Sequence, residues 1–122
     1  MKYHDIPPLS RAEVEEIVAR DDPETLARAV LSACLHPEDA TWAGSLCERL
    51  AGHRDAAVRG NAILGFGHLA RIHRHLTQAS ARALIAAALT DPSDYVRGQA
   101  DAAADDVEQF LGWVCRQPDH LG

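Results

Sequence analysis

One short pattern occurs twice in this chain and restricts what it can fold into. The residues V-R-G-x-A stand at positions 58–62 and again at 96–100, an offset of 38 residues (96 − 58). A weaker copy begins at Arg28-Ala29, and Asp-Pro stands six residues before both Arg28 and Arg97. Self-similarity at a fixed interval is typical of proteins built from stacked structural units. We therefore expect a repeat architecture whose first unit is degenerate.

Start and stop signals of helices recur along the whole chain. Ser10 and Glu13 have the spacing of a capping box, and Asp22-Pro23 has the order of an N-cap and a first helical residue. Between such signals apolar residues recur every three or four positions, without the alternation typical of strands. The sequence predicts an all-α fold of six helices, at about 11–20, 23–34, 37–50, 55–73, 84–89 and 91–115.

Successive helices are expected to pair. The short polar links between them favour helical hairpins, and about three hairpins in a row make a short α-solenoid. The expected units are residues 10–36, 37–75 and 76–115, all within a single domain over residues 1–122. A chain of 122 residues is long enough to bury a core of its own.

Three glycines fall inside the fourth expected helix, where each costs about 1 kcal/mol relative to alanine. Glycine persists in a helix where two backbones must come close, so Gly60, Gly65 and Gly67 are predicted to make room for neighbouring helices. This helix is apolar on most of its sides, as a helix buried between units would be. The last helix has one apolar face, which includes Val114, and one acidic face, as is typical of a terminal unit.

The charge of the chain restricts its partners. It has 18 acidic and 12 basic side chains, a formal net charge of −6 with neutral histidines. Such a field repels nucleic acid and anionic lipid and attracts a basic protein. No apolar run approaches the roughly 18 residues of a membrane span, and residues 1–10 lack the apolar segment of a secretion signal. We expect a cytoplasmic protein that binds neither nucleic acid nor membrane.

The repeats resemble a known family. Residues 91–111, DPSDYVRGQADAAADDVEQFL, and residues 53–72, HRDAAVRGNAILGFGHLARI, are similar to the short bacterial HEAT repeat D-P-x-x-x-V-R-x-x-A, also called PBS-lyase-like; residues 22–34 resemble it weakly. The resemblance implies an α-solenoid whose surfaces bind macromolecules. It implies that Arg59 and Arg97 tie neighbouring units together, with Asp55 and Asp94 as nearby carboxylates. The positions assigned to structure in this way are Arg28, Arg59, Arg97, Gly60 and Gly98.

The chain as a whole bears a looser likeness to the HEAT-type immunity proteins of bacterial polymorphic toxin systems. The likeness rests on its small size, its acidity and the lack of an enzyme signature, and no motif carries it. It implies a protein partner that is a basic toxin or nuclease domain.

The histidines do not have the spacing of a metal site. Zinc ligands on one helix stand at i and i+4, whereas His68, His73 and His75 are separated by five and two residues. We interpret them as a solvent-exposed basic edge together with Arg71 and Arg74. No metal or cofactor is expected.

No catalytic residues are predicted either. The sequence contains no phosphate-binding loop, nucleotide fingerprint or nucleophile elbow. Cys34, Cys47 and Cys115 form no C-x-x-C pair and are expected to be free, buried thiols.

The acidic face of the last helix is the predicted contact with a partner. Asp101, Asp105 and Glu108 follow at i, i+4 and i+7, with Asp106 on the flank. The alternative is that these acidic side chains only form a solvent-exposed outer face and bind no partner. Trp42 and Trp113 are candidate anchors, or simply close the core at its ends. The candidate partner-binding residues are Asp94, Asp101, Asp105, Asp106, Glu108, Trp113 and Trp42.

These observations favour a non-enzymatic protein-binding module, and more specifically an immunity protein that neutralises a basic toxin domain. The alternative is an adaptor or scaffold in a larger complex. A lesser alternative is an enzyme, since HEAT-like proteins include phycobilin lyases and DNA glycosylases. A glycosylase would need a basic groove for DNA, which an acidic chain of this length does not offer.

Overall fold

The computed structural model of this chain describes residues 7–36 and 39–116, and these form six helices and no strand. The helices are α1 (Arg11–Arg20), α2 (Pro23–Leu35), α3 (Ala40–Leu50), α4 (Ala56–His73), α5 (Ala81–Ala88) and α6 (Asp94–Leu111). The predicted all-α class is confirmed.

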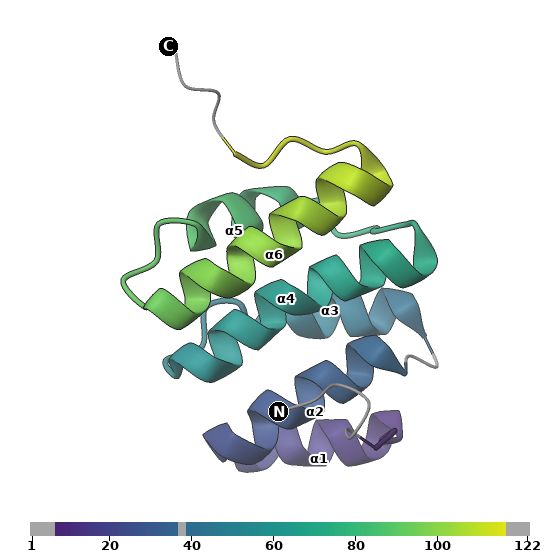
Figure 1. Cartoon of the computed structure of the whole chain (residues 1–122). Coiled ribbons are helices and arrows are strands. Elements are labelled where there is room, and N and C mark those ends of the chain that lie inside the picture. Colours follow the sequence, from purple (N-terminus) through teal and green to yellow (C-terminus); the bar gives the residue numbers. More distant parts are fainter. Residues whose placement is uncertain (1–6, 37–38, 117–122) are drawn as a thin grey trace.

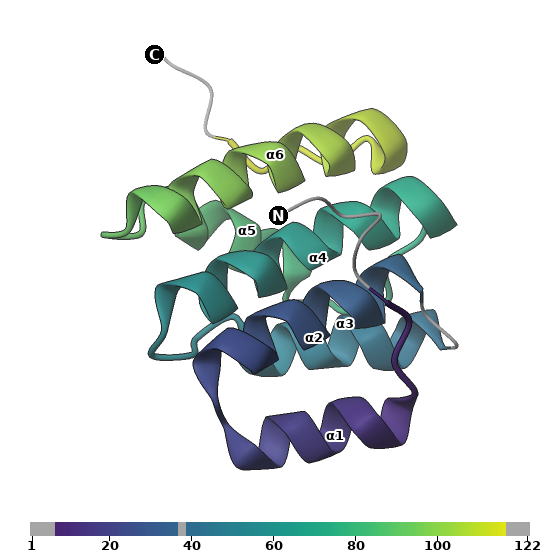
Figure 2. The same ribbon diagram turned by 60° about the horizontal axis from the view of Figure 1, so that its bottom comes forward.

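The helices stack in two layers (Figure 1). Helices α2, α4 and α6 lie side by side in one layer, and α1, α3 and α5 lie behind them, an order that the second view repeats (Figure 2). Helix α4 is in the middle, packed against α2, α3, α5 and α6, and every residue from 61 to 70 is buried. Its central position explains why α4 is apolar on most sides. Helices α1 and α6 lie at opposite ends of the stack.

The predicted helix starts are confirmed where they rest on complete capping motifs. The Ser10 hydroxyl accepts a bond from the Glu13 backbone N–H, and the Glu13 carboxylate accepts one from the Ser10 N–H. Asp22 caps α2 with Pro23 in the first turn. Asp55 caps α4 by accepting bonds from two backbone N–H groups.

The third helix begins later than the sequence predicts. Its expected first residue, Pro37, lies outside the described residues. The helix begins at Ala40, because the Asp39 carboxylate accepts a bond of 3.1 Å from the backbone N–H of Trp42.

The last helix is shorter at both ends than the predicted range of 91–115. It begins at Asp94, because Ser93 accepts a bond from a backbone N–H of the first turn and forms the cap. It ends before Gly112, which adopts a left-handed φ of 70°. Val114 therefore leaves the apolar face predicted for it and is 57% exposed.

The glycines of α4 stand where neighbouring helices come close, as predicted. A Cβ on Gly60 would lie 2.9 Å from the ring of Tyr95, and a Cβ on Gly67 would lie 3.0 Å from the Cα of Ala103, both on α6. Gly65 faces the other side, toward α2 and α3. Glycine at these positions lets α4 pack closely on both sides.

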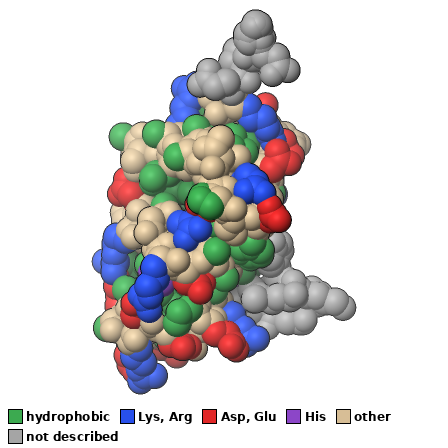
Figure 3. Space-filling model, turned by 90° about the vertical axis from the view of Figure 1, so that its left-hand side faces the viewer, with side chains coloured by type: hydrophobic (Ala, Val, Ile, Leu, Met, Phe, Trp, Pro, Cys, Tyr) green, Lys and Arg blue, Asp and Glu red, His purple; other side chains and the backbone are tan. Residues whose placement is uncertain are grey.

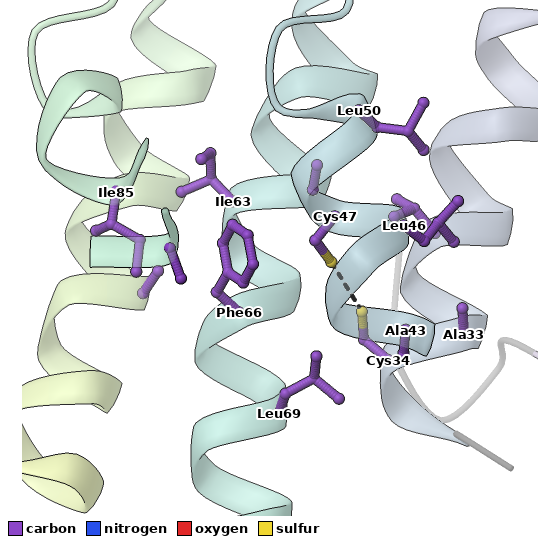
Figure 4. Close-up of a cluster of buried hydrophobic side chains, with 14 of the residues drawn as sticks. Ala33, Cys34, Ala43, Leu46, Cys47, Leu50, Ile63, Phe66, Leu69 and Ile85 are labelled. Carbon is purple, nitrogen blue, oxygen red and sulfur yellow. Dashed lines mark hydrogen bonds between the residues drawn. The ribbon is translucent and has the colours of Figure 1, made fainter. Parts of the chain in front are cut away.

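Two thiols lie beside Gly65 in the core (Figure 4). Cys34 of α2 and Cys47 of α3 are buried and free, as predicted, and their sulfurs are 3.3 Å apart. The hydrogen bond with Cys34, together with burial, raises the pKa of Cys47 well above its ordinary value. Cys47 is therefore a protonated, unreactive packing group. A Cβ on Gly65 would lie 2.6 Å from each sulfur.

Alanine at the two repeat-equivalent glycines should have opposite effects. Gly60→Ala is expected to destabilise the fold by about 1–2 kcal/mol, because the added carbon displaces the Tyr95 ring. Gly98→Ala is expected to stabilise it by up to about 1 kcal/mol, because a Cβ there meets nothing within 4 Å and alanine favours the helix. Urea unfolding of both variants checks this. A shift of the same sign in both would contradict the assigned packing.

Arg59 joins the second and third units through Asp91. Its Nε and Nη2 donate to the two carboxylate oxygens of Asp91 at 2.8 and 2.9 Å, and its Nη1 donates to the carbonyl of His53 at 3.0 Å. Asp55 is a nearby carboxylate, as expected: the bond to Asp91 raises the pKa of Arg59, and the charge of Asp55 contributes to this rise. The Asp55 side chain caps the N-terminus of α4, however, and the bond between units is made to Asp91. The Arg59 guanidinium holds the pKa of Asp91 below its ordinary value.

Within residues 7–36 and 39–116, the other two repeat arginines, Arg28 and Arg97, make no such connection between units. Arg97 contacts Asp94 and donates to the carbonyl of Asp91 at 2.7 Å, so its partners lie at the start of its own helix. Arg28 is exposed on α2. The tie between units inferred for the repeat arginines is thus made by Arg59.

The joint between the first and second units is built on a different carboxylate. Asp21, which has a left-handed φ of 54°, contacts Nε2 of His53 and Nη1 of Arg54, each at 2.6 Å. The bonds from Arg54 and then His53 lower the pKa of Asp21. The loop before α4 is thereby held against the end of α1.

Candidate protein-binding surface

The outward face of α6 carries three carboxylates, Asp101, Asp105 and Glu108, here called the acidic strip. Their side chains are 65%, 69% and 41% exposed. Spacings of three and four residues place them on successive turns of one helix face, as the sequence predicts. Helices α4 and α5 pack against other sides of α6. The strip is therefore open to a partner at this end of the stack.

Arg116 lies across the acidic strip. Its Nη2 donates to Asp101 at 2.7 Å and to Asp105 at 2.8 Å, and its Nη1 contacts Glu108. The hydrogen bond that Arg116 donates to Asp101 is the main cause of a raised pKa for Arg116. One guanidinium against three carboxylates leaves the strip net negative. Sequence reasoning missed Arg116, because it stands beyond the end of α6, where helical periodicity assigns no position.

The two further acids assigned to the partner contact differ from the strip. Asp94 is 95% exposed at the first turn of α6 and contacts Arg97. Asp106 is half-buried and faces α4: its Oδ2 would lie 2.9 Å from a Cβ on Gly67. Burial raises the pKa of Asp106. Asp106 is thus turned away from the strip and into the α4–α6 contact.

The two tryptophans lie at different ends of the stack. Trp42 is only 9% exposed; its indole N–H donates to Glu15 at 2.9 Å, and the Arg11 guanidinium lies 5.3 Å from its ring centre. It ties α3 to α1, far along the stack from α6 (Figure 1). Trp113 follows α6 and packs partly buried against the core. Trp113 is therefore the tryptophan at the α6 end of the stack.

A more exposed aromatic, Tyr95, is not among the predicted partner-binding residues. Its side chain is 47% exposed and its ring lies over Gly60. Its hydroxyl donates to the Asn61 side chain, and Gln99 donates to both groups at 3.0 Å. Asn61 in turn donates to the carbonyl of Ala27 on α2 at 3.0 Å. This network ties the three helices of the front layer together and fixes the Tyr95 ring.

The side of the stack formed by the starts of α2, α4 and α6 carries charges of both signs. Figure 3 faces this side and shows arginine or lysine side chains next to acidic ones. The ion pairs are Asp21–Arg54, Arg59–Asp91 and Arg97–Asp94. Because the charges on this side neutralise one another, it attracts a basic partner less strongly than the acidic strip does.

The predicted basic edge is correct for two of the three histidines. His73 and His75 are exposed, but His68 is only 4% exposed inside α4. Burial and the nearby charge of Arg71 lower the pKa of His68 from 6.5 to about 4. The prediction failed for His68 because α6 and α2 cover α4 on both sides.

Within 7–36 and 39–116, no three His, Cys, Asp or Glu side chains are placed to hold a metal ion. No helix in these ranges is long and apolar enough to cross a membrane.

Comparisons with known proteins find a solved structure of similar fold. No protein-family model matches the chain, and no curated protein matches it. A solved structure described as the crystal structure of a CDI complex from Cupriavidus taiwanensis contains a chain of similar fold, with a TM-score of 0.73 and 28% sequence identity. The match covers 90% of this chain and 97% of that chain. The chain thus resembles, over nearly its whole length, a protein that forms a complex.

Proposed function

We propose that this chain is an immunity protein that binds a toxin domain of a contact-dependent inhibition (CDI) system and neutralises it by covering its surface, without catalysing a reaction. The match to a chain of a CDI complex carries this proposal, because it extends over 97% of that chain at 28% identity. The proposed partner is a basic toxin or nuclease domain, and the two proteins meet in the cytoplasm.

The acidic strip is the surface that we assign to this contact. The chain has a net charge of −6, and the strip places three exposed carboxylates on one helix face at the end of the stack. Complementary charge speeds association and fixes the orientation of two proteins. Trp113, just after the end of α6, and Tyr95, held at the start of α6, offer the aromatic groups that dominate many interfaces.

Capture of the partner from the source cells tests the proposal. The tagged chain is used as wild type and as Asp101→Asn/Asp105→Asn/Glu108→Gln, at low and at high salt, and bound proteins are identified by mass spectrometry. We expect one basic, enzyme-like domain, released by salt. We expect the strip variant to bind it about tenfold or more weakly, as the loss of close charge pairs at an interface does.

A matched variant controls for net charge. Glu16→Gln/Glu24→Gln/Glu48→Gln removes the same charge from exposed positions on α1, α2 and α3, away from α6. It should bind the partner like the wild type. Equal weakening of both variants would contradict the strip as the contact. Several housekeeping partners, held regardless of salt, would contradict the immunity role and favour the adaptor.

A further inference from the structure

The five residues after α6 form a strap, residues 112–116, across the end of the stack. Gly112 reverses the chain with its left-handed φ of 70°. The segment then runs back above α5 (Figure 1). Within it Trp113 packs partly buried against the core, and Cys115 is only 4% exposed. The strap thus covers part of the core that the last helix pair would otherwise leave open.

Polar contacts hold the strap at two points. Nε of Arg82 on α5 donates to the carbonyl of Val114 at 2.9 Å. Arg116 binds all three members of the acidic strip and also donates to the backbone carbonyl of Asp101 at 3.0 Å. The strip carboxylates are between 41% and 69% exposed, so their attraction for Arg116 is screened by salt and is open to competition.

Arg116 occupies the groups that a basic partner would need. A guanidinium is the side chain best suited to bridge several carboxylates, since it presents five N–H donors in one plane. The contact therefore shows that the strip binds a guanidinium group. In this structure that group belongs to Arg116 of the chain itself. A partner arginine that bridges the same three carboxylates competes with Arg116 for them.

We propose that Arg116 is an intramolecular competitor for the acidic strip: an arginine of the protein partner displaces it, and the strap is released. The displacement by a partner rests on the proposed function, whereas the closure of the strap by Arg116 does not. Release uncovers Cys115 and Trp113, which adds apolar surface beside the strip for the partner to cover. Binding and strap release are thus linked.

Alkylation of Cys115 by iodoacetamide measures strap closure without any partner. Arg116→Ala should raise the rate of modification about tenfold, because several exposed ion pairs are lost together and modification follows the open population. Cys34 and Cys47, both 0% exposed, are internal controls for global unfolding. Arg20→Ala removes an exposed arginine that contacts Glu16 and should leave the rate unchanged.

A second variant reaches the same contact from the other side. Asp101→Asn/Asp105→Asn leaves the strap sequence intact and should also raise the rate at Cys115. If neither this variant nor Arg116→Ala changes the rate, Arg116 does not close the strap, whatever the protein binds. If the rates at Cys34 and Cys47 rise equally with that at Cys115, the variants unfold the chain and the strap is no separate unit.

A nine-arginine peptide at low ionic strength probes the competition. It should speed alkylation of Cys115 in the wild type, and it should bind Arg116→Ala about tenfold more tightly than the wild type, since no internal arginine has to leave. Equal binding to both proteins with an unchanged rate at Cys115 would overturn the competition. That outcome leaves the proposed function to be judged by the capture experiment, so the two failures are distinguishable.

Discussion

Replacing Gly65 by alanine is expected to lower the free energy of unfolding by about 3 kcal/mol, although alanine is the better helix former by about 1 kcal/mol. The added Cβ would lie 2.6 Å from the sulfurs of both Cys34 and Cys47. Both sulfurs are buried, so neither has free space into which it can move, and α4 would have to shift away from α2 and α3. Urea unfolding measures the change.

The same substitution in a chain without the two sulfurs is the control. In a Cys34→Ala/Cys47→Ala background, Gly65→Ala fills space that the sulfurs vacated, and it should cost little or should stabilise the fold. A double-mutant cycle isolates this coupling. An equal cost of Gly65→Ala in both backgrounds would show that the glycine is required for a reason other than the thiol pair.

The second large effect is a loss of stability in acid that originates at His68. Its pKa in the folded protein is about 4, lowered by burial and by Arg71 from an ordinary value of 6.5. Between these values the unfolded chain binds a proton that the folded chain does not, so the free energy of unfolding falls as the pH falls from 6.5 toward 4. The slope approaches about 1.4 kcal/mol per pH unit, and the total approaches about 3 kcal/mol.

His68→Gln tests this assignment, because glutamine does not titrate. The raised pKa of Asp106 acts in the opposite direction on the pH dependence, but it is common to both proteins. The stability difference between wild type and variant should therefore change by about 3 kcal/mol between pH 7 and pH 4. A difference that is independent of pH would mean that the pKa of His68 is the same in the folded and the unfolded chain, and would contradict its assignment as a buried neutral imidazole.

The fold was predictable to the extent that local chemistry decides it. Three patterns each favour a single structural interpretation, and each is found as predicted: the capping box at Ser10, the Asp22-Pro23 helix start and the glycines of α4. The end of α6 was not predicted, because Val114 continues the apolar spacing and only the left-handed backbone of Gly112 interrupts the helix. The two ends of one helix were thus decided by single residues, Ser93 and Gly112.

The surface was predictable only in part. The spacing of the acidic residues along α6 predicted that Asp101, Asp105 and Glu108 share one face, because residues three or four positions apart lie on the same side of a helix. It also suggested Asp106, which the packing of α4 against α6 turns inward. The partners of charged groups depend on contacts between units, which no periodicity encodes. The pairing of Arg59 with Asp91, and of Arg116 with the acidic strip, therefore had no signal in the sequence.

Growth protection tests the central claim most directly. Cells that produce the basic domain captured by this chain are grown with and without the wild-type chain, and with the Asp101→Asn/Asp105→Asn/Glu108→Gln variant. If the chain is an immunity protein, the captured domain alone arrests growth, the wild-type chain restores it, and the variant restores it poorly. A captured domain that is harmless alone, or that stays toxic while bound to the chain, would contradict the proposed function.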